Sequence, residues 1–208
     1  MRLVGVPALA CAVLIAASPG TPATGPPPKV TVIGDSVLTS ILWYHEPLTV
    51  IQENLDVRME VAVCRRLTGT SCPFESTTAP TLVQLVRAKG TSLGPTVLVV
   101  MGYNDSERTF AASVEASIGA LLRARVRRIL WATLREVRHP YVRMNETLAA
   151  AARRHPEVRL VDWNRYSRSH PEWFQSDGLH LLPAGGVALA TFLHAAILKA
   201  LSVPLRSG

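Results

Sequence analysis

A serine at a sharp turn is the first residue whose surroundings suggest chemistry. An apolar run at residues 30–33 stops at Gly34, Asp35 and Ser36, and a stretch with helical spacing follows. This pattern predicts a strand, a tight turn and a helix. In an α/β protein such a turn lies at the carboxyl edge of the sheet, and a helix N-terminus favours developing negative charge. Ser36 is therefore a candidate nucleophile, the plain alternative being a helix N-cap.

Further candidate residues follow other predicted strands or lie just beyond the last one: Gly69, Asn104, and the pair Asp177 and His180. A serine hydroxyl reacts only when a base removes its proton, and an imidazole titrates in the working range. A carboxylate beside the imidazole fixes its tautomer. Taken singly, each residue also has an ordinary structural reading as a turn, cap or loop residue.

Taken together, these segments resemble the SGNH (GDSL-type) hydrolases. GDS at 34–36, GYND at 102–105 and DGLH at 177–180 match blocks I, III and V of that family, in the family's order. Gly69 is the candidate for the block II glycine, although its surroundings, RRLTGTSC, depart from the commonest block II pattern. The resemblance covers nearly the whole chain after its first residues.

The resemblance implies a role for each matching residue. Ser36 is the implied nucleophile, His180 the base and Asp177 the residue that orients the base. An oxyanion hole is implied from the Ser36 N–H, the Asn104 amide and the N–H of Gly69, with neighbouring backbone as the alternative to Gly69. We expect no metal and no cofactor.

Residues 161–185 also resemble extracellular SGNH domains attached to acyltransferase membrane proteins, including those that act on peptidoglycan O-acetyl groups. We therefore expect an esterase that hydrolyses a small acyl ester, acetyl first, on a cell-wall or other glycan. An O-acyltransferase that passes the acyl group to a sugar hydroxyl is the first alternative. A catalytically idle glycan-binding domain is the second.

Strands alternate with helices along the chain. Strands are predicted at 29–33, 57–63, 96–102, 127–133 and 158–163, and helices after Ser36 and at about 80–90, 109–123, 141–154 and 184–201. This order predicts a flavodoxin-like three-layer α/β sandwich, with a five-stranded parallel sheet in the order 2-1-3-4-5 and helices on both faces. Trp163, Trp173 and Phe174 are predicted to line either a pocket or the core.

The first residues read as an export signal. Residues 1–23 combine a positive start, an apolar run and small residues, which predicts a signal peptide, with an uncleaved anchor as the alternative. Residues 24–28 form a Pro-rich linker and 29–205 a single domain. No other stretch is expected to cross a membrane. The protein is thus expected outside the bacterial cell, where Cys64 and Cys72 would form a disulfide.

Composition agrees with a globular enzyme. Of 208 residues, 48% are hydrophobic and 18% charged, and the net charge is +7. Arginines at 123, 125, 127 and 128 are a candidate basic patch, but we prefer a solvated helix end because no nucleic-acid motif accompanies them. The expected partner is an acyl ester or acylated glycan, without nucleic acid, and the oligomeric state is not indicated.

Overall fold

Residues 25–204 are described by a computed structural model of the chain. The predicted signal peptide, residues 1–23, lies outside the described residues, as do residues 24 and 205. The elements in chain order are β1 (Lys29–Gly34), η1 (Ser36–Leu38), α1 (Thr39–Trp43), α2 (His45–Gln52), β2 (Asp56–Val61), β3 (Pro73–Phe74), β4 (Thr77–Thr78), α3 (Leu82–Lys89), η2 (Gly90–Leu93), β5 (Thr96–Val100), α4 (Glu107–Arg123), β6 (Arg128–Ala132), α5 (His139–Arg154), β7 (Val158–Val161), α6 (Trp163–Ser167), η3 (Pro171–Trp173) and α7 (Pro183–Leu201).

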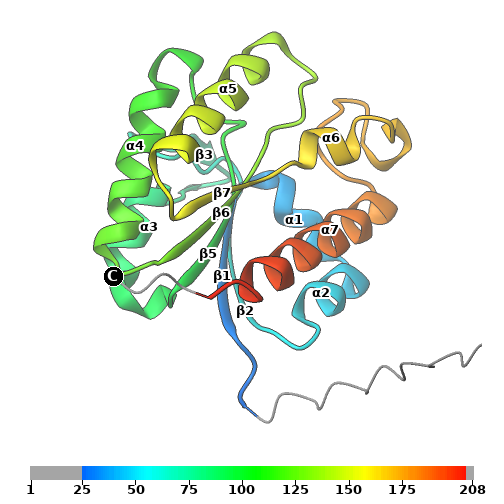
Figure 1. Cartoon of the computed structure of the whole chain (residues 1–208). Coiled ribbons are helices and arrows are strands. Elements are labelled where there is room, and N and C mark those ends of the chain that lie inside the picture. The colour runs from blue at the N-terminus through cyan, green and yellow to red at the C-terminus, as the bar shows by residue number, and fades with distance from the viewer. Residues whose placement is uncertain (1–24, 205–208) are drawn as a thin grey trace, which may run out of the picture.

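A five-stranded parallel sheet forms the centre of the fold (Figure 1). Its order is β2-β1-β5-β6-β7, and every neighbouring pair is parallel. Counted over the five predicted strands, this is the order 2-1-3-4-5, so the predicted topology is confirmed. β1 lies between β2 and β5, which places the turn that follows it near the loops of both neighbours.

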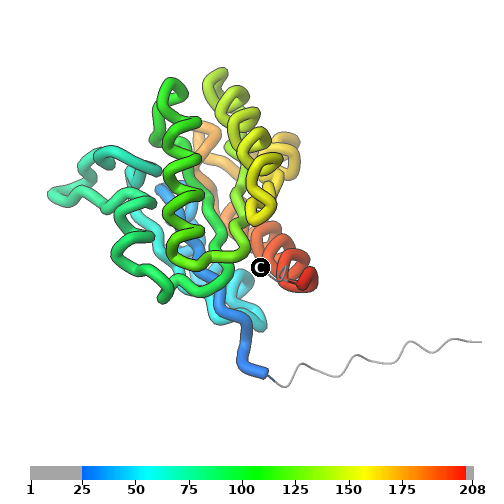
Figure 2. Tube along the Cα trace, turned by 60° about the vertical axis from the view of Figure 1, so that its left-hand side comes forward, coloured from blue at the N-terminus to red at the C-terminus, as the bar shows by residue number. Residues whose placement is uncertain are grey.

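Helices cover both faces of the sheet. α3, α4 and α5 pack on one face and α1, α2 and α7 on the other (Figures 1 and 2). Alternate residues of β5 point to opposite faces, so Val97 and Val99 join one core and Leu98 and Val100 the other. This explains why that strand is apolar on both of its faces after Thr96. Trp163 and Phe174 are buried in the second core, so they pack rather than line a pocket.

The segment behind Ser36 differs from the single predicted helix. It begins as η1, continues as α1 and breaks at Tyr44, whose backbone is extended, before α2 starts. Pro47 accounts for the break, because a proline has no N–H to continue a helix from the preceding turn but fits the first turn of a new one. The β3–β4 hairpin, which follows the cysteine-bounded loop, was also not predicted.

The last helix corrects one sequence expectation. By length and composition α7 could cross a membrane, contrary to the prediction that no stretch after the first residues would do so. Its apolar residues Leu189, Leu193 and Ile197 are completely buried against the sheet. The helix also packs along α2. In this fold α7 is therefore a core helix.

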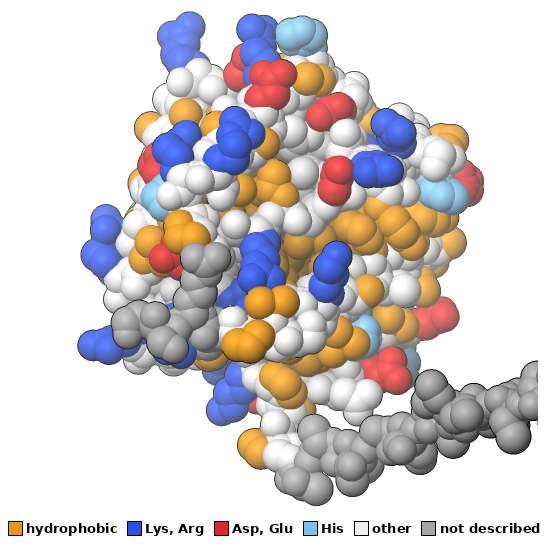
Figure 3. Space-filling view, in the orientation of Figure 1, with side chains coloured by type: hydrophobic (Ala, Val, Ile, Leu, Met, Phe, Trp, Pro, Cys, Tyr) orange, Lys and Arg blue, Asp and Glu red, His pale blue; other side chains and the backbone are white. Residues whose placement is uncertain are grey.

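A groove of about 470 Å³ lies between α7 and the edge strand β7. Leu160, Phe192 and Ala196 line its floor, with Arg159 and Lys199 among its polar residues. Figure 3 shows apolar side chains beside Lys and Arg side chains on this face of the molecule. The residues that line the groove include none of the candidate site residues.

Candidate active site

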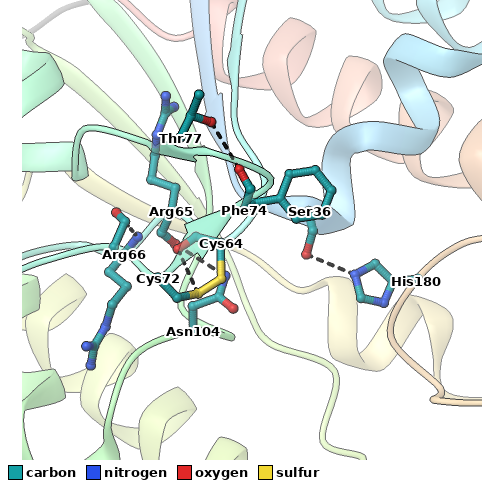
Figure 4. The surroundings of a disulfide bond; sticks show 10 residues. Ser36, Cys64, Arg65, Arg66, Cys72, Phe74, Thr77, Asn104 and His180 are labelled. Carbon is teal, nitrogen blue, oxygen red and sulfur yellow. Dashed lines mark hydrogen bonds between the residues drawn. A yellow bond between two sulfur atoms is a disulfide. The ribbon is translucent and has the colours of Figure 1, made fainter.

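The carboxyl ends of β1, β2 and β5 bring the first candidate residues together. Ser36 opens η1 directly after β1, and the Asp35 carboxylate caps η1 by accepting a hydrogen bond from the N–H of Val37 (3.1 Å). Asn104 follows β5, and the loop after β2 carries Cys64 and Arg65. The Asn104 amide nitrogen donates to the Arg65 carbonyl at 3.3 Å, which ties these two loops together (Figure 4).

Ser36, His180 and Asp177 form a continuous chain of contacts. The Ser36 hydroxyl lies 2.9 Å from Nε2 of His180, across 144 residues of sequence (Figure 4). On the other side of the ring, Nδ1 of His180 lies 2.5 Å from the Asp177 carboxylate. These are the contacts through which a histidine can accept a serine proton while a carboxylate stabilises the resulting imidazolium.

A short turn fixes Asp177 relative to His180. One carboxylate oxygen accepts the backbone N–H groups of Leu179 (2.9 Å) and His180 (3.0 Å), and the other faces the ring. Partial burial by itself would raise the pKa of Asp177, but the hydrogen bonds from the His180 side chain and these two N–H groups lower it below its ordinary value. The carboxylate therefore stays ionised while it holds the imidazole.

Arg135, which follows β6, also holds this turn, and the sequence reasoning did not identify it. Its Nη1 donates to the carbonyl of Gly178 at 2.8 Å, and its guanidinium lies 4.0 Å from the centre of the Phe174 ring. Its own N–H donates to the Tyr103 hydroxyl at 2.8 Å. Its position just beyond a strand's carboxyl end is the signal that could have identified it.

We expect Arg135→Ala to lower kcat for an ester about 10-fold to 100-fold with little change in KM, since a misplaced base slows chemistry more than binding. Steady-state kinetics with Arg153→Ala, an exposed arginine on α5, as the matched control would check this. Equal loss in both variants, or a change confined to KM, would count against a positioning role.

Among residues 25–204, no hydrogen bond links Gly69 to Ser36, Asn104, Asp177 or His180. Gly69 is exposed, with no atom within 4 Å of the place where a Cβ would lie. The preceding Thr68 points its hydroxyl at Ser113 on α4, 2.7 Å away. Its φ of +72° is explained by a turn inside the loop that the Cys64–Cys72 disulfide closes. The oxyanion role predicted for Gly69 therefore has no support from its position.

Asp35 is a buried carboxyl group next to the nucleophile. Its side chain is inaccessible to solvent, and burial raises its pKa from 3.8 to about 7, with backbone hydrogen bonds offsetting only part of the effect. Between these pH values the folded state keeps a proton that the unfolded state releases. The free energy of unfolding therefore falls as pH rises from about 4 to about 7.

We expect Asp35→Asn to reduce this pH dependence. Three units of pKa correspond to about 4 kcal/mol, so the free energy of unfolding of the variant should fall less than that of the wild type between pH 4 and 7, by up to about that amount. Urea denaturation at a series of pH values would measure the difference. Parallel curves for the two proteins would show that Asp35 does not titrate in this range.

A metal centre has no obvious ligands here. Among residues 25–204, no group of three or more His, Cys, Asp and Glu side chains is placed to hold a metal ion. The reaction's independence of metal remains a prediction.

Comparisons with known proteins agree with the fold and the motifs. No family model matches the chain. A carbohydrate acetylesterase family member from Sinorhizobium meliloti superposes with a TM-score of 0.64 at 14% identity, over 85% of this chain and 100% of that one. The salicylyl-acyltransferase SsfX3, from a tetracycline biosynthetic pathway, superposes with a TM-score of 0.63 at 14% identity, over 88% of this chain and 58% of that one. This chain thus shares its fold with a carbohydrate acetylesterase family member and with an acyltransferase.

Part of the chain is similar in sequence to bacterial O-acetyltransferases. The O-acetyltransferase OatA of Staphylococcus aureus (strain NCTC 8325 / PS 47) is 43% identical over 51 residues, which is 24% of this chain and 8% of OatA. The matched segment thus spans about 8% of the length of the curated relatives.

Proposed function

We propose that this protein is an exported serine esterase that removes a small acyl group, acetyl first, from a hydroxyl group of a cell-wall or other glycan. The observation that carries the proposal is the unbroken line of contacts from Ser36 through His180 to Asp177. Structural similarity to a carbohydrate acetylesterase supports the esterase class, and the short match to OatA supports an acetyl group.

In the proposed reaction, Ser36 Oγ bonds to the ester carbonyl carbon while Nε2 of His180 takes the hydroxyl proton. The carbonyl oxygen becomes an oxyanion, which backbone N–H groups and the free hydrogen of the Asn104 amide stabilise. When the intermediate collapses, the ester C–O bond breaks and the alcohol leaves with the proton from His180. Water then attacks the acyl-enzyme by the same route and releases the acid and Ser36.

O-acyl transfer is the second candidate, because a sugar hydroxyl can replace water in the last step. Two observations favour it: the local match to an O-acetyltransferase and the structural similarity to a salicylyl-acyltransferase. Both reactions need the same residues and differ only in what reaches the acyl-enzyme. An idle binding domain is the third candidate, and the intact triad geometry argues against it.

Following the fate of the acetyl group distinguishes the three candidate functions. The protein is incubated with O-acetylated cell-wall fragments, with and without soluble sugar acceptors, and free acetate and acetylated acceptor are measured by mass spectrometry. Release of acetate regardless of acceptor supports the esterase. If acetylated acceptor is the main product, the protein is an O-acyltransferase and the esterase proposal is wrong. If the protein turns over neither these fragments nor p-nitrophenyl acetate faster than the Ser36→Ala variant does, only the binding-domain candidate remains.

The location outside the cytoplasmic membrane of a bacterium is part of the proposal. A disulfide between Cys64 and Cys72 fits an oxidising compartment. The local match to YrhL of Bacillus subtilis (strain 168), which is named as a peptidoglycan O-acetyltransferase, supports action at the cell envelope.

A further inference from the structure

The geometry points to the backbone N–H of Cys64 as the third donor to the oxyanion, held in place by the disulfide to Cys72. This inference rests on the proposed function, since an oxyanion forms only if Ser36 attacks an acyl carbon. It replaces Gly69 in the predicted site with a residue from the same cysteine-bounded loop. It also gives the disulfide a role in the chemistry beyond stability.

Two hydrogen bonds connect the residues around Cys64 to the segments that carry the other two donors. The N–H of Ala62, two residues before Cys64, donates to the carbonyl of Gly34, two residues before Ser36 (3.2 Å). The carbonyl of Arg65, directly after Cys64, accepts from the Asn104 amide. The Cys64 peptide is thus connected on one side to the turn that carries the nucleophile and on the other to the second donor. Figure 4 shows the disulfide and the hydrogen bond from Asn104 to the Arg65 carbonyl.

The N–H of Cys64 is also available. Among the residues that the structure describes, it has no hydrogen-bond acceptor. The N–H groups of the next three residues are engaged: Arg65 donates to Ala62 O, Arg66 to the Ser71 hydroxyl and Leu67 to the Asp105 carboxylate. A free backbone donor at the carboxyl edge of a sheet, next to a nucleophile, is what an oxyanion requires.

The backbone of Cys64 is strained in a way that favours this role. Its φ is +64°, a left-handed conformation that costs a residue with a side chain about 1–2 kcal/mol and that glycine adopts freely. Two restraints hold it there: the bond to Cys72, and the buried Arg65, whose guanidinium donates to the carbonyls of Glu60 and Pro80. Strain kept by surrounding structure is typical of functional positions.

Two double variants separate the effect of the backbone conformation at residue 64 on kcat from the effect of losing the disulfide. Cys64→Gly with Cys72→Ser lacks the disulfide but keeps access to the left-handed conformation. Cys64→Val with Cys72→Ser lacks the same disulfide, and its β-branched residue disfavours that conformation. We expect the glycine variant to keep kcat for p-nitrophenyl acetate within about 3-fold of wild type. The valine variant should lose about 5-fold to 30-fold, because 1–2 kcal/mol of conformational preference is a change of that size in population.

The kinetic signature is a fall in kcat without a comparable change in KM, because the oxyanion exists in the transition state and not in the bound ester. Gly69→Ala serves as the control for the original prediction and should change kcat less than 3-fold. Equal kcat in the glycine and valine variants, or a large loss in Gly69→Ala alone, would overturn the assignment.

Reduction of the wild type gives a second test that does not depend on the valine variant folding. A mild reductant that opens the Cys64–Cys72 bond, verified by a gain of two hydrogens in mass, should lower kcat while KM stays similar. Unchanged kcat in the fully reduced, folded protein would overturn the role of the disulfide. Either result would leave the proposed function intact. If the proposed function itself is wrong, turnover by the wild type would not exceed that of Ser36→Ala.

Discussion

Ser36→Ala is expected to lower kcat for p-nitrophenyl acetate by at least about 10⁴-fold, because removing a triad nucleophile removes the covalent route altogether. What remains would come from the oxyanion donors and binding alone, acting on water. The fold should survive, since the side chain loses only its contact with His180. Steady-state kinetics and thermal denaturation measured on the same preparation would check both expectations.

Ser92→Ala is a matched control for this variant. Ser92 is exposed in η2, which precedes β5 and so lies at the opposite edge of the sheet, and its hydroxyl donates only to the carbonyl of Lys89. Its kcat should equal that of wild type. Retention of more than a tenth of wild-type turnover by Ser36→Ala would remove Ser36 from the proposed mechanism.

Asp177→Asn is expected to have the second-largest effect, a loss of about 10³-fold to 10⁴-fold in kcat. The asparagine oxygen can still accept the N–H groups of Leu179 and His180, so the turn should keep its shape. The amide nitrogen would then face Nδ1 of His180 and donate to it. That reverses the tautomer, so Nε2 carries a proton and cannot take one from Ser36.

The matched control is Asp56→Asn, an exposed aspartate at the start of β2, which should leave kcat unchanged. Neutron diffraction or NMR of the His180 ring nitrogens in Asp177→Asn would reveal the reversed tautomer directly. A wild-type tautomer together with wild-type kcat would contradict the role assigned to Asp177.

Much of the fold and most of the candidate site could be predicted because short sequence patterns indicate them. The alternation of strands and helices, with β5 apolar on both faces, predicted the sheet order that the structure has. The motifs at Ser36, Asn104 and Asp177–His180 predicted residues that the structure brings to one edge of the sheet. Each of these segments is short, and its residue types alone indicate its chemistry.

The rest depends on contacts that no local pattern encodes. Gly69 was predicted because the resemblance implies a glycine in this loop, whereas no local pattern indicates that Cys64, the proposed donor, has a positive φ. Arg135 has no motif of its own, and its role appears only when Gly178 and Phe174 are packed beside it. The break at Tyr44 and the β3–β4 hairpin were also not predicted.

The contact between His180 and Ser36 joins two parts of the chain that are anchored independently. Ser36 follows β1, which has a paired strand on each side, whereas the turn with Asp177 and His180 comes after the edge strand β7 and is secured by Arg135 and by the bridge from Phe174 to Leu181. Loosening of that outer segment would separate base from nucleophile while the central sheet stayed intact. Heat or mild denaturant would then inactivate the enzyme before melting its core.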